Sequence, residues 1–358
     1  MKTILLVASV MIFGLSLSSY GAEEKPVHQK KNVILGLSKV DWSDVTKQNE
    51  FISCVISAME HLGKKYTYDD LACVSGCAFR ACCTSKQNIN PSSYHVTSDI
   101  AIIPHTFKML GYSFTLHKRS DYETDKKLIM DSIDKGIPVL TFHGVANWSE
   151  CCIISGYDDD GAVLLGYSSF CDYTNGARDS EYFRFCDWHD GWFEQGNGKI
   201  LIIGEPTKLP CKEEITKESL KIAVKLIRGT ASESKDWVTG YAGHTRYAEL
   251  LCKDTDDWDM HYTAIATNLG TLYRDKLYVA PFLREAKAVL KDKDDTLEQC
   301  AKLYDQISDL VREMLKLIPD DLSLGKGVLD KELRKQYAQR VYKIRDLEKQ
   351  AADLLEKI

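Results

Sequence analysis

Two short segments, residues 49–63 and residues 150–161, constrain the fold of this chain more than any other feature. In the first, apolar side chains recur at helical spacing after a polar residue and the pattern ends at Gly63, which predicts an amphipathic helix. In the second, an apolar run leads through Gly156 into an acidic turn, which predicts a buried strand.

The remaining pattern from residue 32 to residue 205 predicts an α+β domain. Further helices are expected at residues 68–74, at 99–110 and in a segment that stops at Gly136. Helices that come early in the chain, followed by an antiparallel sheet, are typical of an α+β fold. The expected strands are residues 112–116, 137–142, 151–155, 162–165 and 199–203.

A proline-containing segment at residues 205–210 breaks this pattern and predicts a domain boundary. From residue 212 to residue 358 apolar side chains recur at intervals of three and four, with clear runs at 220–227 and 303–317 and a last helix at 329–358. The second domain is therefore predicted to be all-helical.

The first 21 residues have the charged, apolar and small-residue regions of a secretory signal, and residues 22–31 form a polar tail. The mature protein is thus expected to be exported, to the periplasm or the extracellular space. After the signal, no run is long and apolar enough to predict a membrane span.

The charge of the chain argues against nucleic acid as a partner. The formal net charge is −6, and loss of Lys2 with the signal makes it −7, with no strongly basic block elsewhere. Hydrophobic residues make up 44% of the chain, enough for a core in each of two domains of ordinary size.

All twelve cysteines lie after the signal, and export would permit disulfides, whose pairing a sequence does not reveal. Cys73, Cys77, Cys82 and Cys83 form a cluster that could bind zinc. Because the spacing lacks a paired Cys-x-x-Cys knuckle, disulfides or buried thiols are favoured there, and no metal site is predicted.

The helix that ends at Gly63 and the strand that runs into the Gly156-Tyr157-Asp158 turn together resemble the two halves of a papain-like active site. The resemblance is to the peptidase domains that cleave bacteriocin leaders and to the N-terminal domain of butirosin biosynthesis protein H. In those families a cysteine near the helix start is the nucleophile and a histidine at the strand start is the base. Alignment on the two glycines puts Glu50 at the cysteine position and Glu150 at the histidine position.

The third family position, usually an aspartate or asparagine, falls near Tyr167, so all three positions depart from the peptidase pattern. The resemblance therefore implies the papain-like cysteine-peptidase fold more strongly than it implies proteolysis.

A second resemblance covers most of the mature chain. The hexad at residues 75–80, with segments at 166–168, 240–242 and 284–286, resembles uncharacterised bacterial secreted proteins that join a papain-like domain to a helical tail. Arg80, at the end of the hexad, could bind a ligand carboxylate through two hydrogen bonds or could form a structural ion pair.

Two interpretations are open for each candidate catalytic residue. Cys54, one helical turn after Glu50, is either the nucleophile or a buried thiol among apolar neighbours, and the second is favoured. Glu50 and Glu150 either face each other across a cleft, where one pKa would rise, or are solvated remnants of a degenerate site. His143 is the histidine best placed to line the cleft.

Two functions are consistent with these candidate residues. The first is an amide hydrolase or acyltransferase with an altered catalytic triad, and the alternative is an inactive pseudoenzyme that binds a peptide or small molecule. No cofactor is expected, and the sequence does not indicate an oligomeric state.

Overall fold

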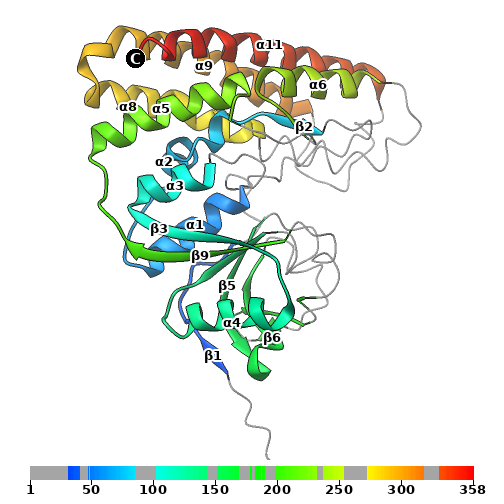
Figure 1. The fold of residues 1–358 in the computed structure, drawn as a ribbon. Coiled ribbons are helices and arrows are strands. Elements are labelled where there is room, and N and C mark those ends of the chain that lie inside the picture. The colour runs from blue at the N-terminus through cyan, green and yellow to red at the C-terminus, as the bar shows by residue number, and fades with distance from the viewer. Residues whose placement is uncertain are drawn as a thin grey trace, which may run out of the picture.

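The computed structural model combines helices with a largely antiparallel sheet, which confirms an α+β protein. Figure 1 shows the sheet at one end of the molecule, a layer of long helices at the other, and shorter helices between them. The structure describes residues 31–40, 47, 49–84, 102–142, 151–168, 178–179, 182–186, 188–189, 198–231, 237–253, 272–317 and 330–358.

The main sheet has the strand order β3-β9-β4-β5-β6-β8-β7, with β1 paired to β5 beyond the end of β4, and its described pairs are antiparallel. The central strands are rich in branched apolar residues and are buried along most of their length, as expected for strands covered by other elements. The strands are β1 (Asn32–Val33), β3 (Tyr112–Lys118), β4 (Val139–Phe142), β5 (Cys152–Asp158), β6 (Val163–Tyr167), β7 (Arg178–Asp179), β8 (Tyr182–Phe185) and β9 (Lys199–Pro206).

The predicted helix at residues 50–63 is present as α1 (Glu50–His61) and packs on β5. Asn49 caps its start, because the side-chain oxygen accepts a hydrogen bond from the backbone N–H of Ile52. Gly63 ends it with a φ of +76°, a left-handed conformation that glycine adopts without a side-chain clash. The other helices of this half are α2 (Tyr68–Val74), α3 (Ile102–Leu110) and α4 (Tyr122–Ile133), with short 3-10 turns η1 (Cys77–Phe79) and η3 (Asp159–Gly161).

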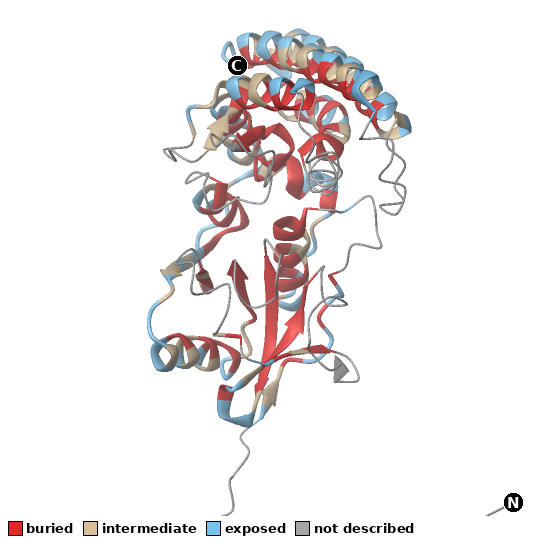
Figure 2. Ribbon diagram, turned by 90° about the vertical axis from the view of Figure 1, so that its right-hand side faces the viewer, coloured by how far each residue is buried: buried red, intermediate tan, exposed pale blue. Residues whose placement is uncertain are grey.

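The second half is a layer of helices in which α11 packs against α6 and α9, and α8 packs against α9. The buried residues of these helices lie mainly on the side that faces the rest of the molecule (Figure 2). The elements are α5 (Lys212–Arg228), α6 (Gly240–Cys252), η7 (Arg274–Tyr278), α8 (Val279–Val289), η8 (Lys291–Lys293), α9 (Asp294–Leu317) and α11 (Lys331–Leu355).

One short strand corrects the prediction of an all-helical second domain. Residues Trp237–Thr239 form β10, which pairs antiparallel with β2 (Cys82–Thr84) from the first half of the chain. Three residues are too few to show a strand period in sequence, and the strand exists because β2 supplies its hydrogen-bonding partner.

Near residue 205, where the sequence predicts a boundary, the chain passes from β9 to α5, and the packing is continuous across this point. The buried apolar side chains of both halves form one connected cluster. In that cluster α2 contacts α5, α8 and η7, and η1 contacts η7, so elements from before the break help to build the core of the helical layer.

Among the described residues, none of the helices combines the length and the apolar character that a membrane crossing requires. The proposed signal at residues 1–21 and the tail up to residue 30 lie outside the described residues.

Candidate functional site

The start of α1 and the start of β5 meet in a buried group formed by Glu50, Cys54 and Cys151. The Oε2 atom of Glu50 accepts a hydrogen bond of 2.9 Å from the backbone N–H of Cys151. The thiol of Cys54, one helical turn further along, lies 3.7 Å from the carbonyl oxygen of Cys151 and is hydrogen-bonded to the thiol of that residue. All three side chains are buried, with at most 2% of each residue exposed.

This environment opposes thiolate chemistry at Cys151. Burial raises the pKa of its thiol well above the ordinary value, and the hydrogen bond with Cys54 and the nearby charge of Glu50 raise it further. Since the thiolate is the nucleophilic form of cysteine, Cys151 is an unreactive thiol at neutral pH in this arrangement.

The structure places the other predicted site residues as follows. Tyr167 is buried in β6, opposite Ile153 of β5, and its ring centroid lies 5.0 Å from that of Tyr182. Glu150 and His143 lie outside the described residues. Cys151, which follows Glu150, is described, and its backbone N–H donates a hydrogen bond to Glu50. The predicted pair of facing carboxylates is therefore not tested.

Arg80 is buried between η1 and β2, where its carbonyl oxygen accepts a hydrogen bond of 3.1 Å from Nζ of Lys276. Its backbone thus lies against the helical layer. Whether its guanidinium binds a ligand stays a prediction.

The position of α1 depends on a residue from the helical layer. The side-chain amide of Asn49, the cap of α1, donates to Oδ2 of Asp275 at 3.2 Å, and the hydroxyl of Tyr68 donates to Oδ1 of Asp275 at 2.8 Å. The same hydroxyl accepts a hydrogen bond of 2.9 Å from the backbone N–H of Asn49. These contacts join the start of α1 to α2 and η7.

The carboxyl group of Asp275 is 1% exposed, and burial raises its pKa to about 6, although the hydrogen bonds from Tyr68 and Asn49 oppose the rise. Burial also raises the pKa of Tyr68 well above its ordinary value, so its hydroxyl stays a donor. This network was not predicted, because Asn49 and Asp275 are 226 residues apart in the sequence.

A second polar group, also not predicted, is formed by side chains of the helical layer. Glu348 accepts hydrogen bonds from Nζ of Lys276 at 2.6 Å and from Nε2 of His244 at 2.7 Å. Nδ1 of His244 lies 3.0 Å from the hydroxyl of Tyr273. Burial alone raises the pKa of Glu348, but Lys276 and His244 outweigh it and hold the pKa below its ordinary value.

One signal in the sequence could have revealed this second group. The buried stripe of α11 recurs at intervals of three and four, through Tyr337, Val341 and Ile344, and the next position of that stripe is Glu348. A carboxylate on an otherwise apolar stripe needs a buried partner.

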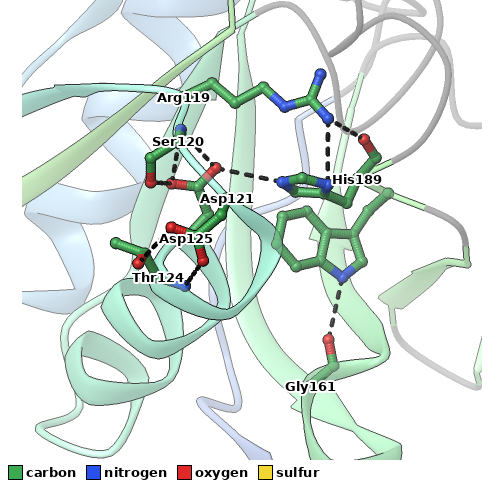
Figure 3. A network of polar contacts seen from close by, with 8 residues as sticks. Arg119, Ser120, Asp121, Thr124, Asp125, Gly161 and His189 are labelled. Atoms are coloured by element: carbon green, nitrogen blue, oxygen red, sulfur yellow. Dashed lines mark hydrogen bonds and ion pairs between the residues drawn. The ribbon is translucent and has the colours of Figure 1, made fainter.

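The sheet end holds a third polar group, shown in Figure 3. The ring of His189 lies between Arg119, whose Nη2 is 3.1 Å from Nδ1, and Asp125, whose Oδ2 is 3.4 Å from Nε2. Because a guanidinium only donates hydrogen bonds, Nδ1 is the acceptor in the contact with Arg119. Ser120 donates its hydroxyl to Asp125 at 2.8 Å rather than to the histidine, so the arrangement is not that of a serine nucleophile.

The cysteines are thiols in the structure wherever they are described, and the cluster of four is buried. Burial raises the pKa of Cys73 well above its ordinary value. Within the described ranges, no group of three or more histidine, cysteine or acidic side chains is placed to hold a metal ion.

A surface groove of about 490 Å³ lies between α6 and α11, away from the start of α1. It carries both charge signs beside apolar and aromatic surface, and its lining residues are Arg246, Glu249, Leu250, Cys252, Lys253 and Tyr342.

Comparisons with known proteins do not assign the chain to a family. Neither a scan against protein-family models nor a search of curated proteins found a match.

Proposed function

We propose that this chain is an exported papain-like protein that has lost peptidase chemistry and binds a peptide or small molecule without turning it over. The observation that carries the proposal is the contact of Glu50, at the position the papain-like resemblance gives to the nucleophile, with the backbone N–H of Cys151. A carboxylate held by that amide stabilises the contact between α1 and β5 and leaves the family's nucleophile position without a thiol.

The environment of Cys54 supports the same proposal. Its exposed fraction is 0%, and its thiol is hydrogen-bonded to that of Cys151. A catalytic cysteine needs an exposed thiol with a lowered pKa and a base within reach. Acyl transfer or amide hydrolysis would require Cys54 to move out of this contact.

The test of lost chemistry is selective alkylation of the folded, fully reduced protein. After removal of the reductant, iodoacetamide is added and the adducts are mapped by mass spectrometry. We expect rapid labelling of Cys186, Cys211 and Cys252, which are exposed, and no labelling of Cys54 on the same timescale. Rapid labelling of Cys54, with turnover of an activated ester or peptide amide that Cys54→Ala abolishes, would overturn the proposal in favour of the enzyme.

Binding is tested with pools of peptides and small metabolites in a thermal-shift assay on the wild-type protein. The Tyr342→Ala variant serves as a control for the groove between α6 and α11. Ligand stabilisation that persists in this variant and is lost in Glu50→Ala would support binding at the start of α1. Stabilisation lost only in Tyr342→Ala would place the ligand site in the groove and contradict the proposed site.

A further inference from the structure

Where the same two elements, α1 and β5, meet, two thiols are in contact, and this has a consequence independent of the proposed function. Cys54 on α1 and Cys151, the residue directly before β5, are both fully buried thiols. The Sγ atom of Cys54 lies 3.7 Å from the carbonyl oxygen of Cys151, and the two side chains are hydrogen-bonded. A disulfide requires an S–S distance of about 2 Å, so the two side chains have to rotate from their present contact to form one.

We propose that Cys54 and Cys151 form a disulfide bond that joins α1 to β5 when the protein folds in the presence of an oxidant. The geometry selects this pair over the neighbouring thiol of Cys152. Successive side chains of a strand point to opposite faces, so Cys151 and Cys152 do not both face α1. Cys151 is the one that contacts Cys54, whereas Cys152 lies within the sheet, opposite Thr141 of β4.

The reaction balances with a small disulfide such as oxidised glutathione as the oxidant. One protein thiolate attacks a glutathione sulfur, the glutathione disulfide breaks, and one reduced glutathione leaves. The second protein thiol then loses its proton and attacks the protein sulfur of the mixed disulfide, which releases the second reduced glutathione. The protein loses two electrons and two protons, and the glutathione disulfide gains them.

Burial determines when this exchange occurs. In the finished fold neither sulfur is exposed, so a glutathione molecule does not reach them. The bond therefore forms during folding, before α1 closes over the start of β5. Once formed, it is shielded from reductants until the protein opens.

The test is disulfide mapping of the full chain refolded with a mixture of reduced and oxidised glutathione. Free thiols are blocked with iodoacetamide, and the protein is digested without reduction and analysed by mass spectrometry. We expect a cross-linked pair of peptides that contain Cys54 and Cys151. Iodoacetamide adducts on both residues, or a bond from either one to a different cysteine, would overturn the proposal.

Variants provide a second measurement. The disulfide would close a loop of about 100 residues. Dithiothreitol present during refolding prevents this bond, and we expect its absence to lower the Tm of the wild-type protein by about 10 °C. The Cys152→Ala control should keep both the cross-link and the effect of dithiothreitol, and Cys54→Ala should lack both. An equal effect of dithiothreitol on wild type and Cys54→Ala would assign the stabilisation to a different bond. If Cys54→Ala does not fold, the wild-type peptide map decides alone.

Discussion

The molecule buries two carboxylates in different ways, one at the sheet and one in the helical layer. Glu50 accepts a hydrogen bond from a backbone amide beside two buried thiols, whereas Glu348 contacts a buried lysine and a buried histidine. A buried charge is tolerated when opposite charge and hydrogen-bond donors compensate for the lost water. In the helical layer that compensation comes from η7 and α6, so Glu348 connects elements that are distant in the sequence.

The comparison explains why only one of the two groups resembles a reactive site. The group around Glu348 has each of its principal charges matched, and burial lowers the pKa of His244 so that the imidazole is neutral beside its partners. The group around Glu50 includes two thiols, whose reactivity depends on exposure and oxidation. The helical-layer group is built for stability, and the group at the sheet is the one whose chemistry can change.

The largest effect is expected for Glu348→Gln, which removes the charge that compensates Lys276. An uncompensated buried charge costs about 3–5 kcal/mol of unfolding free energy. Urea unfolding followed by circular dichroism measures it. As the control, Lys221→Met breaks the exposed ion pair with Glu218 and should cost at most about 1 kcal/mol. Equal losses in the two variants would show that Lys276 and Glu348 are not a coupled buried pair.

The next effect is a pH dependence caused by Asp275, which links the two regions. Its pKa is about 6 in the folded protein and near 3.8 in the unfolded chain, so the folded state binds the proton more tightly. This group therefore stabilises the fold most below pH 4, and its contribution, on the order of 3 kcal/mol, is lost as the pH rises through 6.

Unfolding free energies measured from pH 4 to pH 7 in wild type and in Asp275→Asn test this prediction. The difference between the two curves isolates Asp275 from the other titrating groups. We expect Asp275→Asn to lack the fall in unfolding free energy as the pH rises through 6. Parallel curves for the two proteins would contradict the raised pKa of Asp275.

A smaller loss is expected for Ser120→Ala in the group around His189. The variant removes the hydroxyl that donates to the buried carboxylate of Asp125, while the backbone N–H of residue 120 still donates to both carboxylate oxygens. A hydrogen bond to a charged group contributes about 1.5–3 kcal/mol, and the remaining donors favour the lower end. Chemical denaturation measures the loss, and no change would mean that water replaces the hydroxyl.

The smallest effect is expected for Glu50→Gln, the direct counterpart of Glu348→Gln. The amide oxygen of glutamine still accepts the hydrogen bond from Cys151, so the loss should be about 1 kcal/mol. Denaturation of the two glutamine variants side by side sharpens the comparison. A loss at Glu50 as large as that at Glu348 would show that the charge of Glu50, and not only its role as a hydrogen-bond acceptor, stabilises the fold.

Local pattern was sufficient to predict the elements that have their own signals. The helix between Asn49 and Gly63 has a cap, an apolar face and a terminating glycine, and all three are present in the structure. The strand β10 has no such signal, because its three residues become a strand only by pairing with β2. The break near residue 205 was visible as a change of period, but the packing across it was not.

Like the fold, the candidate site was predicted from the sequence only in part. The papain-like resemblance led to the prediction that the start of the helix and the start of the later strand would be neighbours, and Glu50 does contact Cys151. The dependence of α1 on Asp275 is a contact between distant residues, which no local pattern encodes. The pairing of His244 with Glu348 is of the same kind, although the carboxylate on the apolar stripe of α11 was a usable signal.

The hydrogen bonds from Asn49 and Tyr68 to Asp275 join residues that the ribosome makes at very different times. The ribosome releases residue 49 more than two hundred residues before residue 275, so the first turn of α1 emerges without its acceptor. A nascent chain stopped at residue 206 contains every described strand of the main sheet but neither η7 nor β10. The contacts of Asn49 and Tyr68 with Asp275 therefore form only after residue 275 has been translated, so these links between α1 and the helical layer are made late in synthesis or after it.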